Sequence, residues 1–374
     1  MKKFLALLLA LVMSLSLVAC GGGDDTAADG GADAEDGGNA ETAAYQVAMI
    51  TDYGDITDQS FNQTTYEACQ EFCDAEGLQF EYYKPAGDST AERVAMVDAA
   101  VADGYNVIVM PGYAFAETIK ETAELYPDVT FIALDVAQGD LGEDYTVPSN
   151  VYCAVYQEEL CGYMAGYAAV KLGYTHLGVL GGMAVPAVQR FGYGFVQGAD
   201  AAAKEIGATD VNIKYWYSGG FAATDEVKNK MDGWYSEGTE VVFACGGPVC
   251  TSCDAAAKAN GGKMIGVDVD QSGQFDTVIT SAMKGLAESV NEALTDAMNN
   301  GWKFSETYSG KETKLGAAEN CVGLPMSTSK FTKFTQEQYD SMYASIVDGT
   351  LTIDDSYDAD VKPAVTTITV DYQS

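Results

Sequence analysis

Acidic and aromatic side chains follow directly after several apolar runs of the sequence, and these residues could carry out chemistry. Asp52, Asp135 and Asp268 each follow a run of apolar residues, and Phe221 stands four residues after a run that ends at Tyr217. Carboxylates accept hydrogen bonds from hydroxyl and amino groups, and aromatic rings stack on flat heterocycles. These residue types could therefore bind a small molecule rich in donors, or act as the paired carboxylates of a glycosidase.

From residue 45 onward, short apolar runs alternate with amphipathic stretches of helical length. The predicted strands are 45–50, 79–83, 107–110, 130–134, 176–180, 211–217, 241–244, 263–267 and 278–280. The predicted helices are 60–76, 89–102, 116–125, 158–172, 191–206, 224–236, 250–260 and 284–299. Such alternation predicts an α/β fold, with doubly wound parallel sheets covered by helices on both faces.

This arrangement determines where the candidate residues should meet. Right-handed crossovers place the carboxyl ends of all parallel strands at one edge of a sheet, where ligands bind in such folds. Paired glycines that suit tight turns, Gly181 with Gly182 and Gly246 with Gly247, also follow predicted strands. We therefore expect these segments, far apart in the sequence, to converge on one cleft.

The composition limits the partners that the chain can have. It has 374 residues with 20 Lys and Arg against 55 Asp and Glu, a formal charge of −35, and 47% of it is hydrophobic. The apolar share supports a large core, and the length suggests two domains. A charge this negative disfavours nucleic acid and an anionic lipid surface as electrostatic partners.

Basic and metal-ligating side chains are scarce. His176 is the single histidine, which leaves little room for histidine catalysis or a multi-histidine metal site, so we expect no metal and no cofactor. Arg93 and Arg190 are the only arginines, so a polyanionic ligand would find few bidentate donors. Residues 261–264 lack the ending of a phosphate-binding loop, and an uncharged ligand is favoured.

The first 44 residues are typical of a signal peptide followed by a flexible linker. Lys2 and Lys3 precede an apolar run, and the sequence LVAC at 17–20 resembles the lipobox of bacterial lipoproteins, whose cysteine is lipidated. We therefore predict a signal peptide over 1–19, lipidation of Cys20, and a position on the outer face of the cell membrane. Residues 20–44 are rich in Gly, Ala and acids, which predicts an extended flexible tether.

Eight further cysteines leave two structural alternatives open. An even number in an exported chain is compatible with disulfides, yet a chain of this size can also keep buried free thiols. Cys250 and Cys253 have the spacing of a redox motif, but no second pair or nearby histidine completes a metal site. Buried thiols or a local disulfide are favoured over a redox role.

Four longer motifs resemble, in order, those of the basic membrane protein (Bmp) family of substrate-binding lipoproteins. They are MITDYGDITDQSFN at 49–62, YPDVTFIALD at 126–135, GGMAVPAVQRFGYGF at 181–195 and IGVDVDQ at 265–271. The resemblance implies a type I periplasmic-binding fold with two lobes joined by a hinge. It implies a first lobe over 45–150, completed by about 270–305, and a second over 151–269, completed by about 306–374.

The resemblance also implies a function without bond chemistry. The best-known members of the family bind purine nucleosides between the lobes for an ABC permease with its ATPase subunits. We expect the same partners here, and a monomer anchored by its N-terminal lipid. Phe61 and Phe221 look like the aromatic pair that sandwiches the base. Asn62 suits a purine edge, Asp52 or Asp135 could contact that edge, and Asp268 looks placed to accept ribose hydroxyls.

The resemblance also implies roles for Lys284 and Gly246. Lys284 resembles the ribose-side lysine of the family, and Gly246 belongs to the glycine turn of the binding site. The sequence departs from the family pattern at Pro248 and Cys250 and at residues 222–224, which affects the base-side wall.

Other functions use similar residues. Sugars bind the same fold with aromatic rings flanking the pyranose, and another neutral heterocycle would also suit stacked rings. A nucleoside hydrolase or glycosidase could use Asp52, Asp135 and Asp268 as its carboxylates. A surface antigen with a vestigial cleft is a further alternative. We favour a binding protein over an enzyme.

Overall fold

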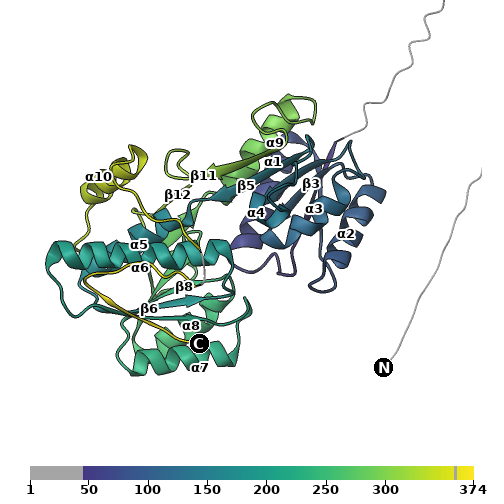
Figure 1. Cartoon of the computed structure of the whole chain (residues 1–374). Coiled ribbons are helices and arrows are strands. Elements are labelled where there is room, and N and C mark those ends of the chain that lie inside the picture. Colours follow the sequence, from purple (N-terminus) through teal and green to yellow (C-terminus); the bar gives the residue numbers. More distant parts are fainter. Residues whose placement is uncertain (1–44, 358–359) are drawn as a thin grey trace, which may run out of the picture. The chain divides into compact units, whose positions relative to one another are not determined.

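The strands of the protein form two separate sheets (Figure 1) in a computed structural model that describes residues 45–357 and 360–374. The predicted signal peptide, Cys20 and the tether lie outside the described residues. We call each sheet with the helices that pack on it a lobe.

The first lobe contains a six-stranded sheet in the order β11-β5-β4-β3-β1-β2, with all neighbours parallel. Its strands are β1 (Gln46–Ile50), β2 (Gln79–Tyr83), β3 (Val107–Pro111), β4 (Thr130–Leu134), β5 (Val151–Tyr156) and β11 (Lys311–Leu315). Helices α1 (Phe61–Glu76) and α9 (Leu286–Asn299) cover one face, and α2 (Thr90–Ala102), α3 (Ala116–Thr122) and α4 (Gln138–Leu141) cover the other. The predicted α/β fold with helices on both faces is confirmed.

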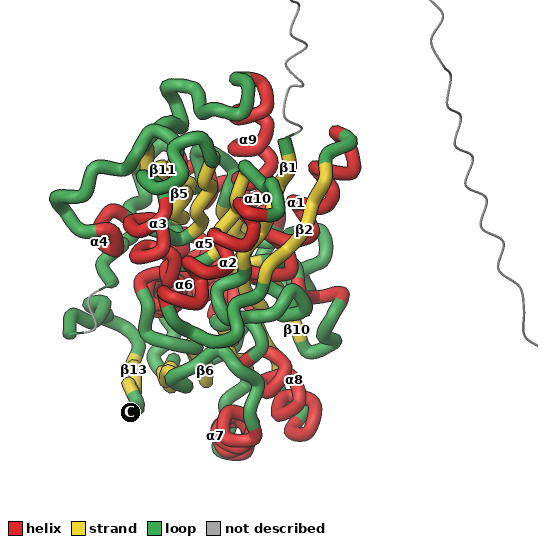
Figure 2. Tube along the Cα trace, turned by 90° about the vertical axis from the view of Figure 1, so that its right-hand side faces the viewer, coloured by secondary structure: helices red, strands yellow, loops and turns green. Residues whose placement is uncertain are grey.

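The second lobe contains a seven-stranded sheet in the order β12-β10-β9-β8-β6-β7-β13, parallel except where β12 meets β10. Its strands are β6 (His176–Gly181), β7 (Asn212–Tyr217), β8 (Val241–Cys245), β9 (Lys263–Asp268), β10 (Val278–Lys284), β12 (Val322–Gly323) and β13 (Thr369–Tyr372). Helices α5 (Glu158–Leu172) and α6 (Pro186–Ile206) pack on one face, and α7 (Asp225–Ser236) and α8 (Val249–Asn260) on the other. Helix α10 (Gln336–Val347) packs against the α5 side. Figure 2 shows helices flanking the strands in the perpendicular view.

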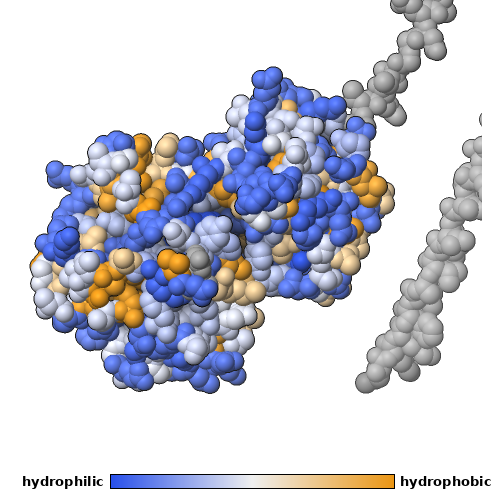
Figure 3. Space-filling view, in the orientation of Figure 1, coloured by the Kyte–Doolittle hydropathy of each residue, from blue (hydrophilic) through white to orange (hydrophobic). Residues whose placement is uncertain are grey.

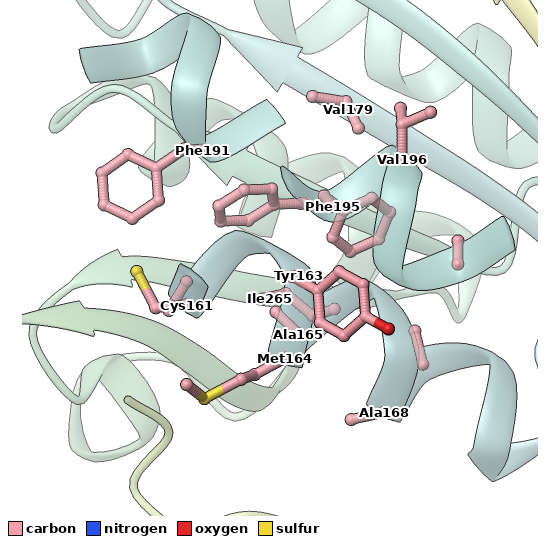
Figure 4. Packing of buried hydrophobic residues seen from close by; sticks show 14 of the residues in the cluster. Cys161, Tyr163, Met164, Ala165, Ala168, Val179, Phe191, Phe195, Val196 and Ile265 are labelled. Carbon is pink, nitrogen blue, oxygen red and sulfur yellow. The ribbon is translucent and has the colours of Figure 1, made fainter. Parts of the chain in front are cut away.

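The largest core cluster lies between α5, α6 and the second sheet. Phe195 stacks on Phe243 with ring centroids 5.3 Å apart, and Phe191 meets the same ring edge-on at 6.0 Å. Figure 4 shows these helices contributing phenylalanine, tyrosine, methionine and alanine side chains to this packing. On the face seen in Figure 3, hydrophobic residues occur in groups between hydrophilic ones.

The two lobes share one topology. Apart from the added edge strands β11, β12 and β13, their orders are β5-β4-β3-β1-β2 and β10-β9-β8-β6-β7. Strand β4 therefore corresponds to β9, and β3 corresponds to β8. Residues that follow corresponding strands face the same edge of each sheet, which is where the expected cleft lies.

The chain passes between the lobes at three neighbouring points, Gln157, Gly285 and Gly316. The Gln157 N–H donates to the carbonyl of Leu315 at 2.9 Å, and the Cys321 N–H donates to that of Gly316 at 2.8 Å. The Gly285 N–H donates to the Cys321 carbonyl at 2.7 Å. These bonds tie the three crossovers together into one hinge.

The strands divide between the sheets differently from the predicted boundaries. Strand β5 lies in the first sheet, although residue 151 was expected to open the second lobe, and β11 also joins the first sheet. Strand β10 pairs with β9 in the second sheet and does not complete the first lobe. The sequence gives no signal for these exchanges, because the passages at Gln157 and Gly285 take only one residue each.

Several elements differ from their predicted ranges. Helix α6 begins at Pro186 and not at 191, since proline is well suited to the first helical turn. Strand β10 extends to Lys284, so this residue ends a strand and does not begin a helix. Strands β5, β11, β12 and β13 and helices α4 and α10 were not predicted. Strand β11 has the sequence KETKL and is largely exposed, so it lacks the apolar run that identifies a buried strand.

Candidate functional site

A cavity of about 350 Å³ lies between the two lobes, at the carboxyl ends of the strands. Its volume falls within the range of about 300–1,000 Å³ typical of small-molecule sites. Its walls include every binding residue expected from the sequence, namely Asp52, Phe61, Asn62, Asp135, Phe221, Gly246, Asp268 and Lys284. The structure therefore brings these segments together around one cavity, as expected from the sequence.

The two phenylalanines come from opposite lobes. Phe61 is the first residue of α1, and the ammonium of Lys284 lies 4.8 Å from its ring centroid. Phe221 follows β7 and packs against Gly182, where a Cβ atom would lie 2.3 Å from the ring. Both residues line the cavity.

Asp52 and Asn62 form a polar pair beside Gly54. Oδ1 of Asp52 accepts the backbone N–H groups of Tyr53 and Gly54, both at 2.7 Å. The amide of Asn62 donates to Oδ2 of Asp58 at 3.1 Å, and its Oδ1 is buried without a partner. Burial raises the pKa of Asp52, and the backbone N–H groups and the Asn62 amide oppose this rise.

Four charged groups form a buried network that crosses the cleft. Nζ of Lys284 lies 2.6 Å from Oδ2 of Asp135 in the first lobe and 3.3 Å from Oε1 of Glu158. Nε of Arg190 lies 2.7 Å from Oε2 of the same glutamate. The Lys284 and Glu158 side chains are 2% and 0% exposed. Charges this deep in a protein are stable only when paired, so the network acts as a unit.

The pKa directions follow from burial and these partners. Burial raises the pKa of Asp135 to about 6, although Lys284 opposes the rise. Burial also acts to raise the pKa of Glu158, but Arg190 and Lys284 outweigh it and hold this pKa below its usual range. The neighbouring acids raise the pKa of Lys284 above its ordinary value despite burial. At neutral pH the ammonium is therefore charged.

Asp268 connects the lobes from the other side. Its Oδ2 accepts a hydrogen bond of 2.5 Å from the hydroxyl of Ser60, which precedes α1 of the first lobe. Gln271 of the second lobe donates to the carbonyl of Gln59 at 3.1 Å. Burial raises the pKa of Asp268, while Lys284 and Ser60 oppose the rise. The lobes thus touch on both sides of the Lys284 ammonium.

Asp135 directly follows β4, and Asp268 is the last residue of the corresponding strand β9. Both have left-handed backbones, with φ of 59° and 65°, which aspartate adopts more readily than most residues. Neither caps the helix that follows, since Ala137 precedes α4 and Asp270 precedes the short turn after β9. Their carboxylates therefore serve the cleft and not a helix end.

Gly246 fills a position that admits no larger residue. Its φ is 155°, and a Cβ atom there would lie 3.0 Å from the backbone of Gly182 and 3.1 Å from the Phe221 ring. Pro248 and Ala222, where the sequence departs from the expected pattern, also line the cavity. These two of the departing positions therefore contribute to the cavity wall.

Some functional neighbours were not identified from the sequence. Arg190 and Phe191 line the cavity, and the fully buried Glu158 pairs with Arg190 and Lys284. Nζ of Lys284 lies 5.7 Å from the Phe191 ring centroid. Arg190 and Phe191 stand inside the motif at 181–195, which could have indicated them. Glu158 gives no such signal, because acids in the first turn of a helix, such as Glu158 and Glu159 in α5, usually face solvent.

The eight cysteines of the described region are free and buried, so the alternative of buried thiols is the one observed. Within residues 45–357 and 360–374, no group of three or more potential ligands is arranged to hold a metal ion. In the same region, none of the helices combines the length and apolar character needed to cross a membrane.

Comparison with known proteins identifies the family of the chain. The family model described as ABC transporter substrate-binding protein PnrA-like (Bmp) matches residues 45–356. The ABC transporter nucleoside-binding protein BmpA of Lactococcus lactis subsp. cremoris is 25% identical over 331 residues, covering 82% of this chain and 88% of its own. The CD4+ T-cell-stimulating antigen of Listeria innocua is 25% identical, covering 94% and 98%.

Solved structures agree on the fold. An ABC transporter solute-binding protein from Aeropyrum pernix K1 has a TM-score of 0.71 at 22% identity, covering 84% of this chain and 95% of its own. One from Conexibacter woesei has a TM-score of 0.66 at 22% identity, covering 83% and 99%. The fold is that of the type I periplasmic-binding proteins. Since the family model covers most of its length, the chain belongs to the Bmp family of ABC transporter substrate-binding proteins.

Proposed function

We propose that this protein is the extracytoplasmic receptor of an ABC importer and that it binds a nucleoside, with purines as the expected class, between its lobes. The observation that carries the proposal is that Phe61 and Phe221 reach one cavity of about 350 Å³ from opposite lobes. A heterocycle stacked between two such rings gains dispersion and stacking energy from both faces. A relative at 25% identity carries a nucleoside-binding name, which supports this class of ligand.

The polar residues of the cleft suit the two parts of a nucleoside. Asp52 and Asn62 lie next to Phe61 and would read the edge of the base. Asp135 and Asp268 lie near Lys284 and would accept hydrogen bonds from the ribose hydroxyls. Oδ1 of Asp135 has no hydrogen-bond partner within the protein and so remains available for such a bond. Gly246 allows Phe221 to approach closely.

The charge of the cleft favours an uncharged ligand over its phosphate. Six acidic residues line the cavity against three basic ones: Asp52, Asp55, Asp58, Asp135, Asp140 and Asp268 against Lys84, Arg190 and Lys284. Both Lys284 and Arg190 are already paired with carboxylates. A nucleotide would bring further negative charge into a site with no free cation at its floor, which opposes binding.

Binding would couple to closure of the lobes and not to a bond-breaking step. A ligand that contacts both lobes has differential affinity for the closed form, and this form is what a permease would recognise. We propose an ABC permease and its ATPase subunits as the partners of a monomeric receptor. No cofactor is required for such a cycle.

We propose that lipidation of Cys20 anchors the protein to the outer face of the cell membrane. The lipobox-like sequence before Cys20 and the acidic stretch after it support this placement. Expression with labelled palmitate should give a labelled protein, and the variant Cys20→Ser should appear unlabelled in the soluble fraction. Label retained on this variant would contradict the anchor.

The ligand class is tested by mass spectrometry and calorimetry. The protein is denatured and the released small molecule identified, and adenosine, guanosine, inosine, ribose and glucose are then titrated separately. We expect binding of nucleosides and recovery of the intact ligand. Binding of ribose or glucose without any nucleoside signal would identify a sugar receptor. Slow conversion of the nucleoside to free base would identify a hydrolase.

A further inference from the structure

Asp52, Asn62 and Asp58 form the part of the cavity wall beside Phe61, and their contacts with one another determine which of their atoms can donate or accept hydrogen bonds. The Asn62 Nδ2 donates to Oδ2 of Asp58 at 3.1 Å. The same amide faces the carboxylate of Asp52, for which it acts as a donor. Exchanging the amide oxygen and nitrogen would set the oxygen against two carboxylates. The remaining polar atom of Asn62, its Oδ1, is therefore an acceptor, and it is buried without a partner.

Asp58 is itself held in place, so it keeps Asn62 in this orientation. Its Oδ1 accepts the backbone N–H groups of Ser60 at 2.9 Å and Gln63 at 3.0 Å. Its Oδ2 accepts the N–H of Asn62 at 2.9 Å in addition to the amide. These bonds satisfy free N–H groups at the start of α1, where an aspartate is favoured.

Asp52 presents the second acceptor of the wall. Its Oδ1 accepts the N–H groups of Tyr53 and Gly54. Its Oδ2 keeps a lone pair for a ligand even where the Asn62 amide donates to the same carboxylate. Gly54 lies between the two groups, since a Cβ atom there would be 2.5 Å from Nδ2 of Asn62 and 3.0 Å from Oδ1 of Asp52. The wall beside Phe61 thus offers two neighbouring acceptors and no free side-chain donor from Asp52 or Asn62.

We infer that this wall selects a base whose edge donates two neighbouring hydrogens, which makes guanine nucleosides the preferred ligands. The inference rests on the proposed function and specifies its ligand. Guanine carries an N1–H next to a 2-amino group, so it can supply both acceptors. Hypoxanthine keeps N1–H but lacks the amino group, and adenine places the lone pair of N1 beside its single amino donor.

The expected differences in affinity follow from the hydrogen bonds that each base fails to make with these two acceptors. With inosine one buried acceptor stays unpaired, and with adenosine a lone pair also faces a carboxylate. A buried polar group left without its partner costs about 1–3 kcal/mol, which corresponds to about 5- to 150-fold in affinity. Guanosine should therefore bind at least about fivefold more tightly than inosine, and adenosine should bind most weakly of the three.

Calorimetry of the unliganded protein at pH 7.5 with guanosine, inosine and adenosine tests the ranking. Equal or tighter binding of adenosine would overturn the inference and leave the nucleoside receptor intact. Absence of binding for all three would overturn both, so the two failures are distinguishable.

The variant Asp58→Asn tests the cause of the ranking. Asparagine can keep the bonds that Oδ1 accepts from Ser60 and Gln63, but its amide replaces the oxygen that accepts the N–H of Asn62. That amide can donate to Oδ1 of Asn62 and so allow Asn62 to turn its own amide toward the ligand. We expect the ratio of guanosine to adenosine affinity to fall about tenfold, with a single cooperative thermal transition as the check on folding. An unchanged ratio in a folded variant would contradict the role given to Asp58. Gln59→Ala, beside the same turn, is the matched control and should keep the ratio.

Discussion

Nζ of Lys284, at the end of β10 in the second lobe, lies 2.6 Å from Oδ2 of Asp135, which follows β4 in the first lobe. The same ammonium lies 3.3 Å from Glu158, which is fully buried and also pairs with Arg190. One cation therefore neutralises acids from both lobes at the floor of the cleft. Its removal would leave two carboxylates with one remaining cation.

The variant Lys284→Met tests this dependence, because methionine keeps much of the side-chain volume and removes the charge. Breaking a buried pair by removing one partner costs about 3–5 kcal/mol, and we expect a loss of free energy of unfolding in that range. Urea denaturation at pH 7.5 measures it. Lys228→Met is the control, since Lys228 pairs with Asp232 at the surface and should cost less than about 1 kcal/mol. Equal effects of the two variants would contradict the role of Lys284.

Glu159 gives the protein a pH-dependent stability. Burial, with Glu158 beside it, raises the pKa of Glu159 to about 7 from an ordinary value of 4.5, and its Oε2 has no partner. Between about pH 4.5 and 7 the folded protein holds a proton here that the unfolded chain has released. This group therefore makes stability fall as the pH rises through that window.

The variant Glu159→Gln should remove this dependence. We expect it to be more stable than the original protein at pH 8, by at most about 3 kcal/mol, and to gain nothing at pH 4.5. Glu205→Gln is the opposite control, since Lys171 and Tyr167 hold the pKa of Glu205 below its usual value. That substitution should lower stability at pH 8. A Glu159→Gln effect that is equal at both pH values would show that the carboxyl titrates normally.

The sequence predicts the cleft better than it predicts the hinge, and there is a physical reason. Asp52, Asp135 and Asp268 follow strands whose apolar runs are easy to recognise, and parallel topology then brings strand ends together. Strand β11 is short and exposed, so no run of apolar residues reveals it. The passages at Gln157 and Gly285 take one residue each and leave no pattern in composition.

The contacts between residues of the cleft were harder to predict than the residues that line it. Lys284 was expected on the ribose side by resemblance, but its pairing with Glu158 depends on how α5 docks behind β10. The hydrogen bond from Ser60 to Asp268 joins residues 208 positions apart, from different lobes. Contacts of this kind depend on how the two lobes approach, which local sequence patterns do not encode.

Gly54 should admit no side chain without loss of binding. A Cβ atom would lie 2.5 Å from Nδ2 of Asn62 and 3.0 Å from Oδ1 of Asp52, so Gly54→Ala must displace the base-side acceptors. We expect nucleoside affinity to fall at least tenfold in calorimetry, since a misplaced pair leaves about 1–3 kcal/mol of hydrogen bonding unmade. Gly220→Ala is the matched control, because nothing lies within 4 Å of its added Cβ. Equal affinities of both variants would remove Asp52 and Asn62 from the site.

Phe221 should contribute to binding more than to folding. Its ring is partly buried in the cleft wall against Gly182 and Gly246, so Phe221→Ala removes a stacking surface and little of the core. We expect a loss of about 1–3 kcal/mol in nucleoside binding. Tyr82→Ala, an exposed aromatic on the edge strand β2, should leave the affinity unchanged. An unchanged affinity for Phe221→Ala would exclude this ring from the site.

Close contact between α5 and α6 depends on glycines, and this leads to a prediction about stability alone. A Cβ atom at Gly166 would lie 2.0 Å from the backbone oxygen of Phe195. Because backbone atoms inside a helix cannot move aside separately, the two helices would have to move apart. At Gly233, inside α7, nothing lies within 4 Å of an added Cβ atom. The same substitution should therefore act in opposite directions at the two positions.

Gly166→Ala must separate the two helices and disturb the core around Phe195, which we expect to cost at least about 1–3 kcal/mol, as overpacking does. Gly233→Ala should instead stabilise α7 by about 0.5–1 kcal/mol, because alanine restricts the unfolded chain and favours the helix. Urea denaturation of both variants against the original protein measures the two signs. Since neither position lines the cleft, ligand affinity should be unchanged in Gly233→Ala. A stabilising Gly166→Ala would mean that α5 and α6 are not in contact at this point.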